Sequence, residues 1–163
     1  MSGLIELDMT VNDDFFEPRS FDPAPAGVYL FSVCGKKGSY PIEIVESKDS
    51  HLPMVSVELH IEAGPKGEET PHKGKVVFEN FVLKNKDGQK NEISLKMLTH
   101  MLLSFGATTE DAVKNKTPLD VSLLGPTNRG LAEIYIKSDK DQTGADRQQN
   151  HVRNFFWKPE QVK

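Results

Sequence analysis

The sequence predicts a mainly β domain that carries one α-helix and follows an acidic N-terminal segment. Apolar residues alternate with polar ones over several short segments, which is the period of a half-buried strand. Residues 92–105 instead repeat their apolar side chains every three or four positions, as an amphipathic helix does. Strands and helices do not alternate along the sequence, which disfavours a doubly wound parallel sheet.

The expected strands come in two groups, before and after the helix. Residues 27–34 are rich in β-branched and aromatic side chains and lead into a basic turn at 35–38. The strongest alternation lies in 54–62, where every second residue from Val55 to Ile61 is apolar. The expected strands are 27–47, which is long and bent or broken, then 54–62, 75–83, 118–124, 130–137 and 151–157.

The single long helix has start and stop signals. Asn91 is the expected N-cap, and Glu92 then falls in the first turn, where the helix dipole favours an acid. Gly106 follows the last periodic residue and is the expected C′ residue. A short helical turn over 109–114, capped by Thr108 or Thr109, should follow.

This order of elements matches a five-stranded Greek-key barrel of the OB type, with the helix between the third and fourth strands. Residues 151–157 would then be an extra C-terminal strand. An α+β sandwich with the helix covering one sheet is the alternative, and the pattern does not separate the two. We expect an acidic, loosely ordered arm at 1–25, the OB-like domain at 26–160 and a short tail at 161–163.

Charge is divided unevenly between the arm and the domain. The 163 residues carry 20 Lys and Arg against 24 Asp and Glu, a net charge of −4. The arm has six acids and one base, which is −5, so the remaining residues carry 19 bases and 18 acids, which is +1. The net charge therefore does not exclude a nucleic-acid ligand for the domain.

The sequence offers little catalytic or metal chemistry. The five histidines are scattered, and Cys34 is the single cysteine, so we expect no metal site, no cofactor and no catalytic residue. Cys34 should be a small buried hydrophobe. The N-terminus lacks a signal-peptide pattern and the chain lacks a bilayer-length apolar stretch, so we expect a cytoplasmic protein without membrane contact.

Basic and aromatic residues interleave, which is typical of surfaces that bind single-stranded nucleic acid. Tyr135 is the strongest stacking candidate, because it shares a strand face with Glu133 and Lys137 while its apolar neighbours face the other way. A core role for Phe78, Phe81 and Phe156 is the alternative. The expected nucleic-acid contacts are Phe31, Lys36, Lys37, Lys48, Lys75, Phe81, Lys84, Arg129, Tyr135, Lys137, Arg153, Phe155 and Trp157.

Several motifs resemble, in the same order, a family of small phage-encoded proteins found beside replication and recombination genes. They are Phe21-Asp-Pro-Ala-Pro-Ala-Gly-Val-Tyr29, Met54-Val-Ser-Val-Glu-Leu-His-Ile-Glu62, Gly74-Lys-Val-Val-Phe-Glu-Asn-Phe81, the helix end Phe105-Gly106, and residues 150–159. The resemblance implies an OB-like single-stranded DNA-binding protein of phage replication or recombination, in the host cytoplasm. It supplies no catalytic residue.

We therefore expect a non-enzymatic, largely sequence-independent single-stranded DNA binder that protects or organises the strand. Replication or recombination proteins are the expected partners, and a dimer or a cooperative array fits this function, although the sequence leaves the oligomeric state open. The alternative is a protein–protein adaptor or accessory structural phage protein that uses the aromatic face as a docking patch. An enzyme is the remote third class.

Overall fold

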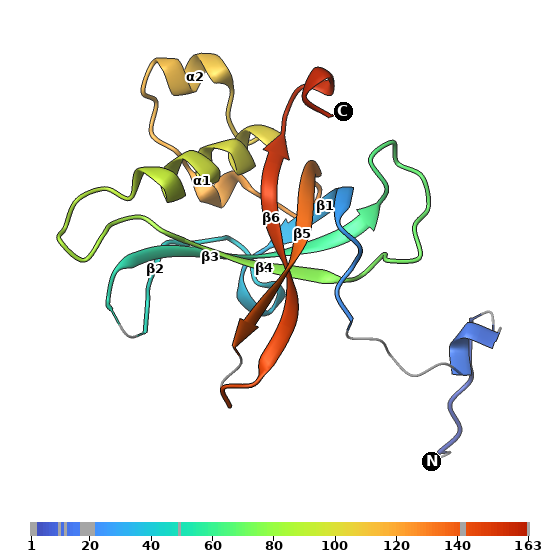
Figure 1. Ribbon diagram of the computed structural model, residues 1–163. Helices are drawn as coiled ribbons and strands as arrows, with labels where there is room; N and C mark the ends of the chain where they lie inside the picture. Colours follow the sequence, from blue (N-terminus) through green and yellow to red (C-terminus); the bar gives the residue numbers. More distant parts are fainter. Residues whose placement is uncertain are drawn as a thin grey trace.

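The computed structural model describes residues 3–9, 11, 13–16, 22–48, 50–140 and 143–162 (Figure 1). Parts of the predicted arm and the last residue of the predicted tail lie outside these ranges. The strands are β1 (Gly27–Cys34), β2 (Val45–Glu46), β3 (Pro53–Ala63), β4 (Val76–Val82), β5 (Gly130–Lys140) and β6 (Asp146–Phe156). The α-helices are α1 (Glu92–Ser104) and α2 (Glu110–Lys114), and 3-10 turns occur at Asp13–Phe16, Lys36–Gly38, Val121–Leu123 and Pro159–Gln161.

All strand pairs are antiparallel and belong to one sheet. The path runs β2-β3-β1-β5-β6, and β4 pairs with the other side of β3. The long strands therefore have the neighbour order β4-β3-β1-β5-β6, with β4 and β6 at the two ends. These end strands approach each other, and the Val152 backbone N–H of β6 donates a hydrogen bond to Glu79 Oε1 of β4 at 2.7 Å. The sheet thus curls toward a barrel.

Helix α1 packs across β4, β5 and β6 and covers one end of the curled sheet (Figure 1). Its buried residues Leu98, Met101 and Leu102 recur at helical spacing and join the core formed by the inner faces of the strands. The predicted caps are confirmed, because Asn91 accepts a hydrogen bond from the Ser94 N–H and Gly106 has a left-handed φ of 77°.

The packed part of the chain begins before the first strand. Ala24 is fully buried, its N–H donates to Asn150 Oδ1 at 2.8 Å, and its carbonyl accepts from Asn150 Nδ2 at 2.9 Å. A buried amide side chain that satisfies both backbone groups of a loop residue fixes that residue in place. The predicted boundary at 26 therefore falls just inside the packed structure.

The predicted mainly β class with one long helix is confirmed, but the strand at 118–124 is wrong. The Asp120 side chain accepts a hydrogen bond from the Ser122 N–H and starts a 3-10 turn, which buries Val121 and Leu124 and leaves Leu123 exposed. The segment 151–157 is therefore not an extra strand. It is the end of β6, the fifth long strand of the sheet.

The hairpin of β5 and β6 is longer than its hydrophobic pattern suggests. Residues 138–149 read as a polar loop, yet pairing continues out to Lys140 and Asp146, whose side chains form an ion pair of 2.9 Å. Backbone hydrogen bonds between the two strands extend the hairpin beyond the core through these polar residues. Because no backbone pairing joins β4 to β6 within the described ranges, a closed barrel stays a prediction.

No helix among the described residues combines the length and apolar character that crossing a lipid bilayer requires.

Candidate functional site

Strands β3 and β4 present one face to the core and the other to solvent. Directly paired residues of antiparallel strands share a face, so Glu58 lies beside Phe78 and Ser56 beside Asn80 on the outer side. Phe78 is 60% exposed in the middle of this surface. An aromatic ring held at this exposure on a rigid strand is available to a flat ligand.

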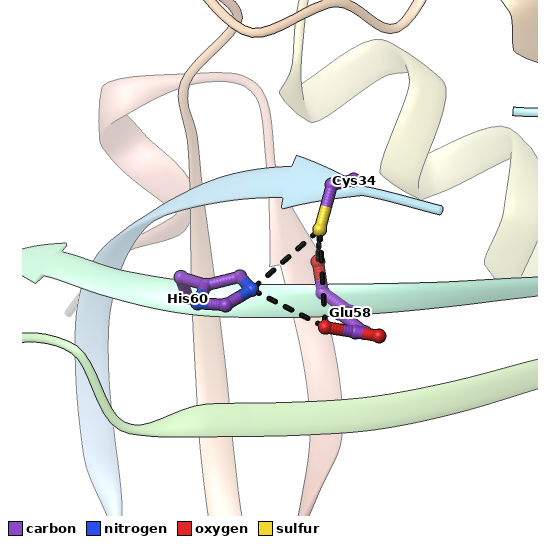
Figure 2. A group of neighbouring side chains, drawn as sticks. All are labelled: Cys34, Glu58 and His60. Carbon is purple, nitrogen blue, oxygen red and sulfur yellow. Dashed lines mark hydrogen bonds and ion pairs between the residues drawn. The ribbon is translucent and has the colours of Figure 1, made fainter. Parts of the chain in front are cut away.

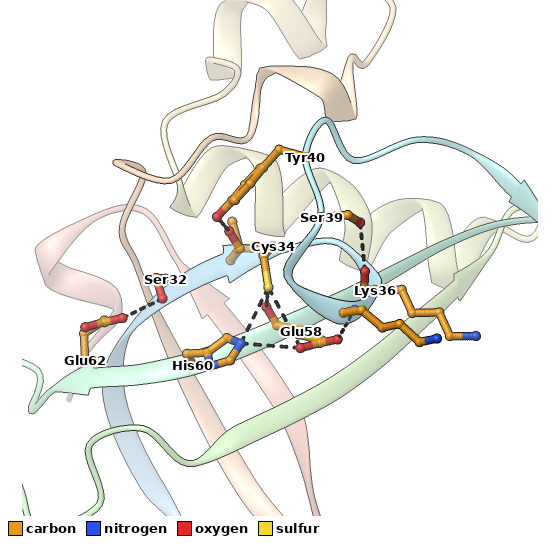
Figure 3. Close-up of polar contacts among 10 residues, drawn as sticks. Ser32, Cys34, Lys36, Ser39, Tyr40, Glu58, His60 and Glu62 are labelled. Atoms are coloured by element: carbon orange, nitrogen blue, oxygen red, sulfur yellow. Dashed lines mark hydrogen bonds and ion pairs between the residues drawn. The ribbon is translucent and has the colours of Figure 1, made fainter. Parts of the chain in front are cut away.

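A first groove lies between this face and the connection from β1 to β3. It encloses about 830 Å³ and is lined by Phe78, Met54 and Asn80 on the strands. Three cations, Lys36, Lys37 and Lys48, line it from the loop side, together with the acids Glu43 and Glu46. The turn that carries Lys36 and Lys37 is held by the Ser39 hydroxyl, which donates to the Lys36 carbonyl at 2.8 Å (Figure 3).

A second groove lies on the other side of Phe78. It encloses about 630 Å³ between residues 71–76 and the start of β6. Its cations are Lys73, Lys75 and Arg147, of which Lys75 donates to the Asp22 carbonyl at 3.0 Å. Phe78 lines both grooves. The exposed ring therefore stands between two grooves that are each bordered by three cations.

Three acids of β3 and β4 are engaged within the protein. The Lys37 N–H donates to Glu58 Oε2 at 2.6 Å, and the Ser32 hydroxyl donates to Glu62 Oε1 at 2.7 Å. Glu79 points away from the outer face, toward β6, where it accepts from the Val152 N–H. Burial raises the pKa of Glu79, which the hydrogen bond from Val152 and the charge of His151 offset only in part.

The contribution of Glu79 to the stability of the fold should change with pH in the direction opposite to that of a salt-bridged acid. Because its folded-state pKa is raised, the folded chain holds this proton more tightly than the unfolded chain, and this group adds stability as pH falls through that range. Glu79→Gln keeps an oxygen acceptor for Val152 without the buried charge. We expect its urea midpoint to exceed that of wild type at pH 7, with the gain shrinking toward pH ~4.

Glu79→Ala is the matched variant, because it removes the acceptor as well as the charge. Leaving the Val152 N–H unpaired should cost about 1–3 kcal/mol. Equal destabilisation by both substitutions at pH 7 would show that the charge of Glu79 stabilises the fold.

The structure places four of the predicted contact residues in the two grooves and five others outside them. Lys36, Lys37, Lys48 and Lys75 line the two grooves. The residues outside the grooves are Lys84, Arg129, Tyr135, Lys137 and Arg153. Lys84 forms an isolated β-bridge with Lys90, and Arg129 donates to the carbonyls of Pro126 and Asn128. On the β5–β6 hairpin, Lys137 pairs with Asp139, and Arg153 lies 5.0 Å from the Tyr135 ring centroid. Tyr135 thus already has a cation on its face.

Three predicted stacking residues belong to the core. Phe31, Phe81 and Phe155 are 0%, 4% and 2% exposed. Their rings pack in the core, so they have no free face for a base. On β4, Phe81 therefore has the core role given as the alternative, whereas Phe78 does not, because it points outward.

Trp157 lies at the helical end of the molecule. Its indole N–H donates to Glu110 Oε1 at 3.2 Å, and its ring centroid lies 4.7 Å from that of His100 on α1. These contacts tie the C-terminal end of the chain to both α-helices. These contacts give Trp157 a structural role.

The residues that sequence reasoning did not select are Phe78, Lys73 and Arg147. Residues 76–82 carry apolar side chains at Val76, Val77, Phe78 and Phe81, so both faces of β4 look partly hydrophobic. The usable signal was Asn80, a polar residue two positions after Phe78 and therefore on the same strand face, in a strand that follows a turn with Lys73 and Lys75. Arg147 lay in a segment read as a loop.

A polar cluster lies on the same outer face, where β1 pairs with β3 (Figure 2). Cys34 Sγ lies 3.5 Å from His60 Nε2 and 4.0 Å from Glu58 Oε1, and His60 Nε2 lies 3.5 Å from Glu58 Oε1. Burial, with the negative charge of Glu58, raises the pKa of the Cys34 thiol. Cys34 is buried, as expected for a small hydrophobe, yet its sulfur meets two polar side chains.

The cluster does not have the arrangement of a Cys–His–acid catalytic triad. In such a triad one imidazole nitrogen faces the nucleophile and the acid binds the opposite nitrogen. Here the thiol and the carboxylate both meet Nε2 of His60. The three ligand atoms instead lie within 4.8 Å of one another, which is close enough for them to share one metal ion.

The sequence matches no protein-family model and no curated protein.

Proposed function

We propose that this protein binds single-stranded DNA, largely without regard to sequence, on the outer face of β3 and β4. The observation that carries the proposal is the exposed Phe78 ring between two cation-bordered grooves. Single-strand binders combine these parts, because unstacked bases need a flat apolar platform and the backbone needs cations along its track.

The exposed cations on this face support the proposal. Glu62 accepts a hydrogen bond from Ser32 and Glu79 is turned toward β6, whereas Glu43, Glu46 and Glu58 line the first groove beside its three lysines. The side chains of Lys36, Lys37, Lys48, Lys73 and Arg147 are exposed. A polyanion would therefore meet cations on both sides of Phe78.

The position of the grooves also supports it. The strand order β4-β3-β1-β5-β6 is that of a five-stranded OB barrel opened between its third and fifth strands. In OB domains, oligonucleotides bind on the second and third strands, between the loop that follows the first strand and the loop that joins the last two. Phe78 and the two grooves occupy the corresponding place. The phage replication or recombination setting stays a prediction.

The cations of the two grooves predict how strongly the affinity for DNA should depend on salt concentration. In a titration of fluorescently labelled oligo(dT) followed by anisotropy, we expect wild-type affinity to fall linearly with salt on a log–log plot. The double variants Lys36→Ala/Lys48→Ala and Lys73→Ala/Arg147→Ala should each reduce the magnitude of the slope by about 1.4, since one phosphate contact on a single strand contributes about 0.7. Lys75 is left intact because its side chain donates to the Asp22 carbonyl, and Lys37 because its backbone has a left-handed φ of 60°.

The matched control is Lys114→Ala/Lys116→Ala, which removes two exposed lysines near α2 and should leave the slope unchanged. Anisotropy of the labelled DNA is preferred to tryptophan fluorescence, because Trp157 packs on His100 of α1 and lines neither groove. No binding at low salt would favour the adaptor function instead. Binding with the wild-type slope in both groove variants would remove the grooves from the interface.

A further inference from the structure

We propose that Cys34, Glu58 and His60 form a binding site for one tetrahedral divalent metal ion of the zinc class. The proposal rests on the side-chain geometry of the cluster and is independent of DNA binding. Figures 2 and 3 show the three side chains converging on the solvent face of β1 and β3.

The distances between the three ligand atoms fit a metal at their centre. Zinc lies about 2.3 Å from sulfur and about 2.0–2.2 Å from nitrogen or oxygen, so adjacent ligands of a tetrahedral site are about 3.3–3.6 Å apart. The distances from His60 Nε2 to the sulfur and to the carboxylate oxygen are both 3.5 Å, and the remaining one is 4.0 Å. An inward movement of a few tenths of an ångström at Glu58 would complete the set.

The fold presents the ligands on rigid elements. Glu58 and His60 are two residues apart on β3 and therefore project from the same face. Cys34 is the direct cross-strand partner of Glu58. The second carboxylate oxygen of Glu58 accepts the Lys37 N–H at 2.6 Å, which orients Oε1 toward the cluster.

The chemistry of the donors selects the metal. One thiolate, one imidazole and one carboxylate form a set that zinc favours, whereas magnesium and calcium prefer oxygen ligands alone. On binding, the Cys34 thiol gives its proton to solvent and the sulfur bonds to the metal as thiolate. Three protein ligands leave the fourth position to a water molecule, as in open zinc sites.

Cobalt(II) tests the site directly, because it replaces zinc in tetrahedral sites and is coloured. Cys34 is the single cysteine, so a thiolate-to-cobalt charge-transfer band on adding Co²⁺ to the reduced protein would identify this sulfur as a ligand. We expect that band together with the intense visible bands of tetrahedral Co²⁺, saturating at one equivalent and lost on adding Zn²⁺. Zinc at 100 times its dissociation constant should also raise the melting temperature by about 5–10 °C.

Variants separate this site from adventitious binding. Cys34→Ser should abolish the charge-transfer band, and His60→Gln should weaken Zn²⁺ binding, measured calorimetrically, by about tenfold or more. His51→Gln is the matched control, because His51 is an exposed loop histidine outside the cluster, and it should bind like wild type. His60 is only half-buried, so its variant should fold and can decide the question if Cys34→Ser does not.

Two results would overturn the proposal. One is the lack of a charge-transfer band when Co²⁺ is added to reduced, folded wild-type protein. The other is Zn²⁺ affinity and stoichiometry in His60→Gln that equal those of His51→Gln.

Discussion

Phe78→Ala is expected to weaken binding of oligo(dT) about 5- to 150-fold. Stacking of one base on an aromatic ring contributes about 1–3 kcal/mol by alanine substitution, which converts to that range of affinity. Phe78 is the exposed ring that lines both grooves, so its loss removes the platform and leaves the cations in place. Anisotropy titrations at several salt concentrations should therefore show a lower affinity with an unchanged salt slope.

Two further variants make this measurement specific. Phe16→Ala removes a ring of the same kind, 75% exposed, from the N-terminal segment outside the two grooves, and should leave affinity unchanged. Phe78→Trp keeps an aromatic platform and should retain binding. The free energy of unfolding of Phe78→Ala should stay within about 0.5 kcal/mol of wild type, because the ring is largely exposed. Wild-type affinity in Phe78→Ala would remove this residue from the interface.

Phe31→Ala is expected to lower the free energy of unfolding by about 3–5 kcal/mol. Phe31 is fully buried on β1, where it is part of the core, and truncation would leave a cavity in addition to the lost transfer energy. Urea denaturation followed by far-UV circular dichroism measures the loss. Such a loss is a large share of the stability of a single domain.

The same variant distinguishes the two interpretations of Phe31. A residue that stacks on DNA would lose affinity at unchanged stability when truncated, whereas a core residue loses stability first. Phe31→Leu is the milder companion, since it keeps most of the buried apolar volume and should cost less than the alanine variant. Weak oligo(dT) binding by a fully stable Phe31→Ala protein would return Phe31 to the interface.

Local patterns predicted most of the elements. The alternation in 54–62 and 27–34 predicted β3 and β1 within about one residue at each end, and Asn91 and Gly106 marked the limits of α1. These signals are local, because side chains two apart on a strand share a face whatever the strand pairs with. The strand expected at 118–124 failed for an equally local reason, the capping side chain of Asp120.

The site was predicted less completely, because it depends on register. Lys36 and Lys37 could be placed on a turn, and they do line a groove. Phe78 and Phe81 could not be told apart, since only the pairing of Phe78 with Glu58 and of Phe81 with Val55 assigns one ring to solvent and the other to the core. A shift of one residue would exchange them.

The sequence by itself thus determined the mainly β class, the helix and its caps, and an acidic segment ahead of a nearly neutral domain. Only the tertiary structure decided which face of each strand meets solvent. It also placed Cys34 beside Glu58, 24 residues further along the chain. The physical reason is that alternation is a property of one strand, whereas register is set by the packing of all the strands and the helix together.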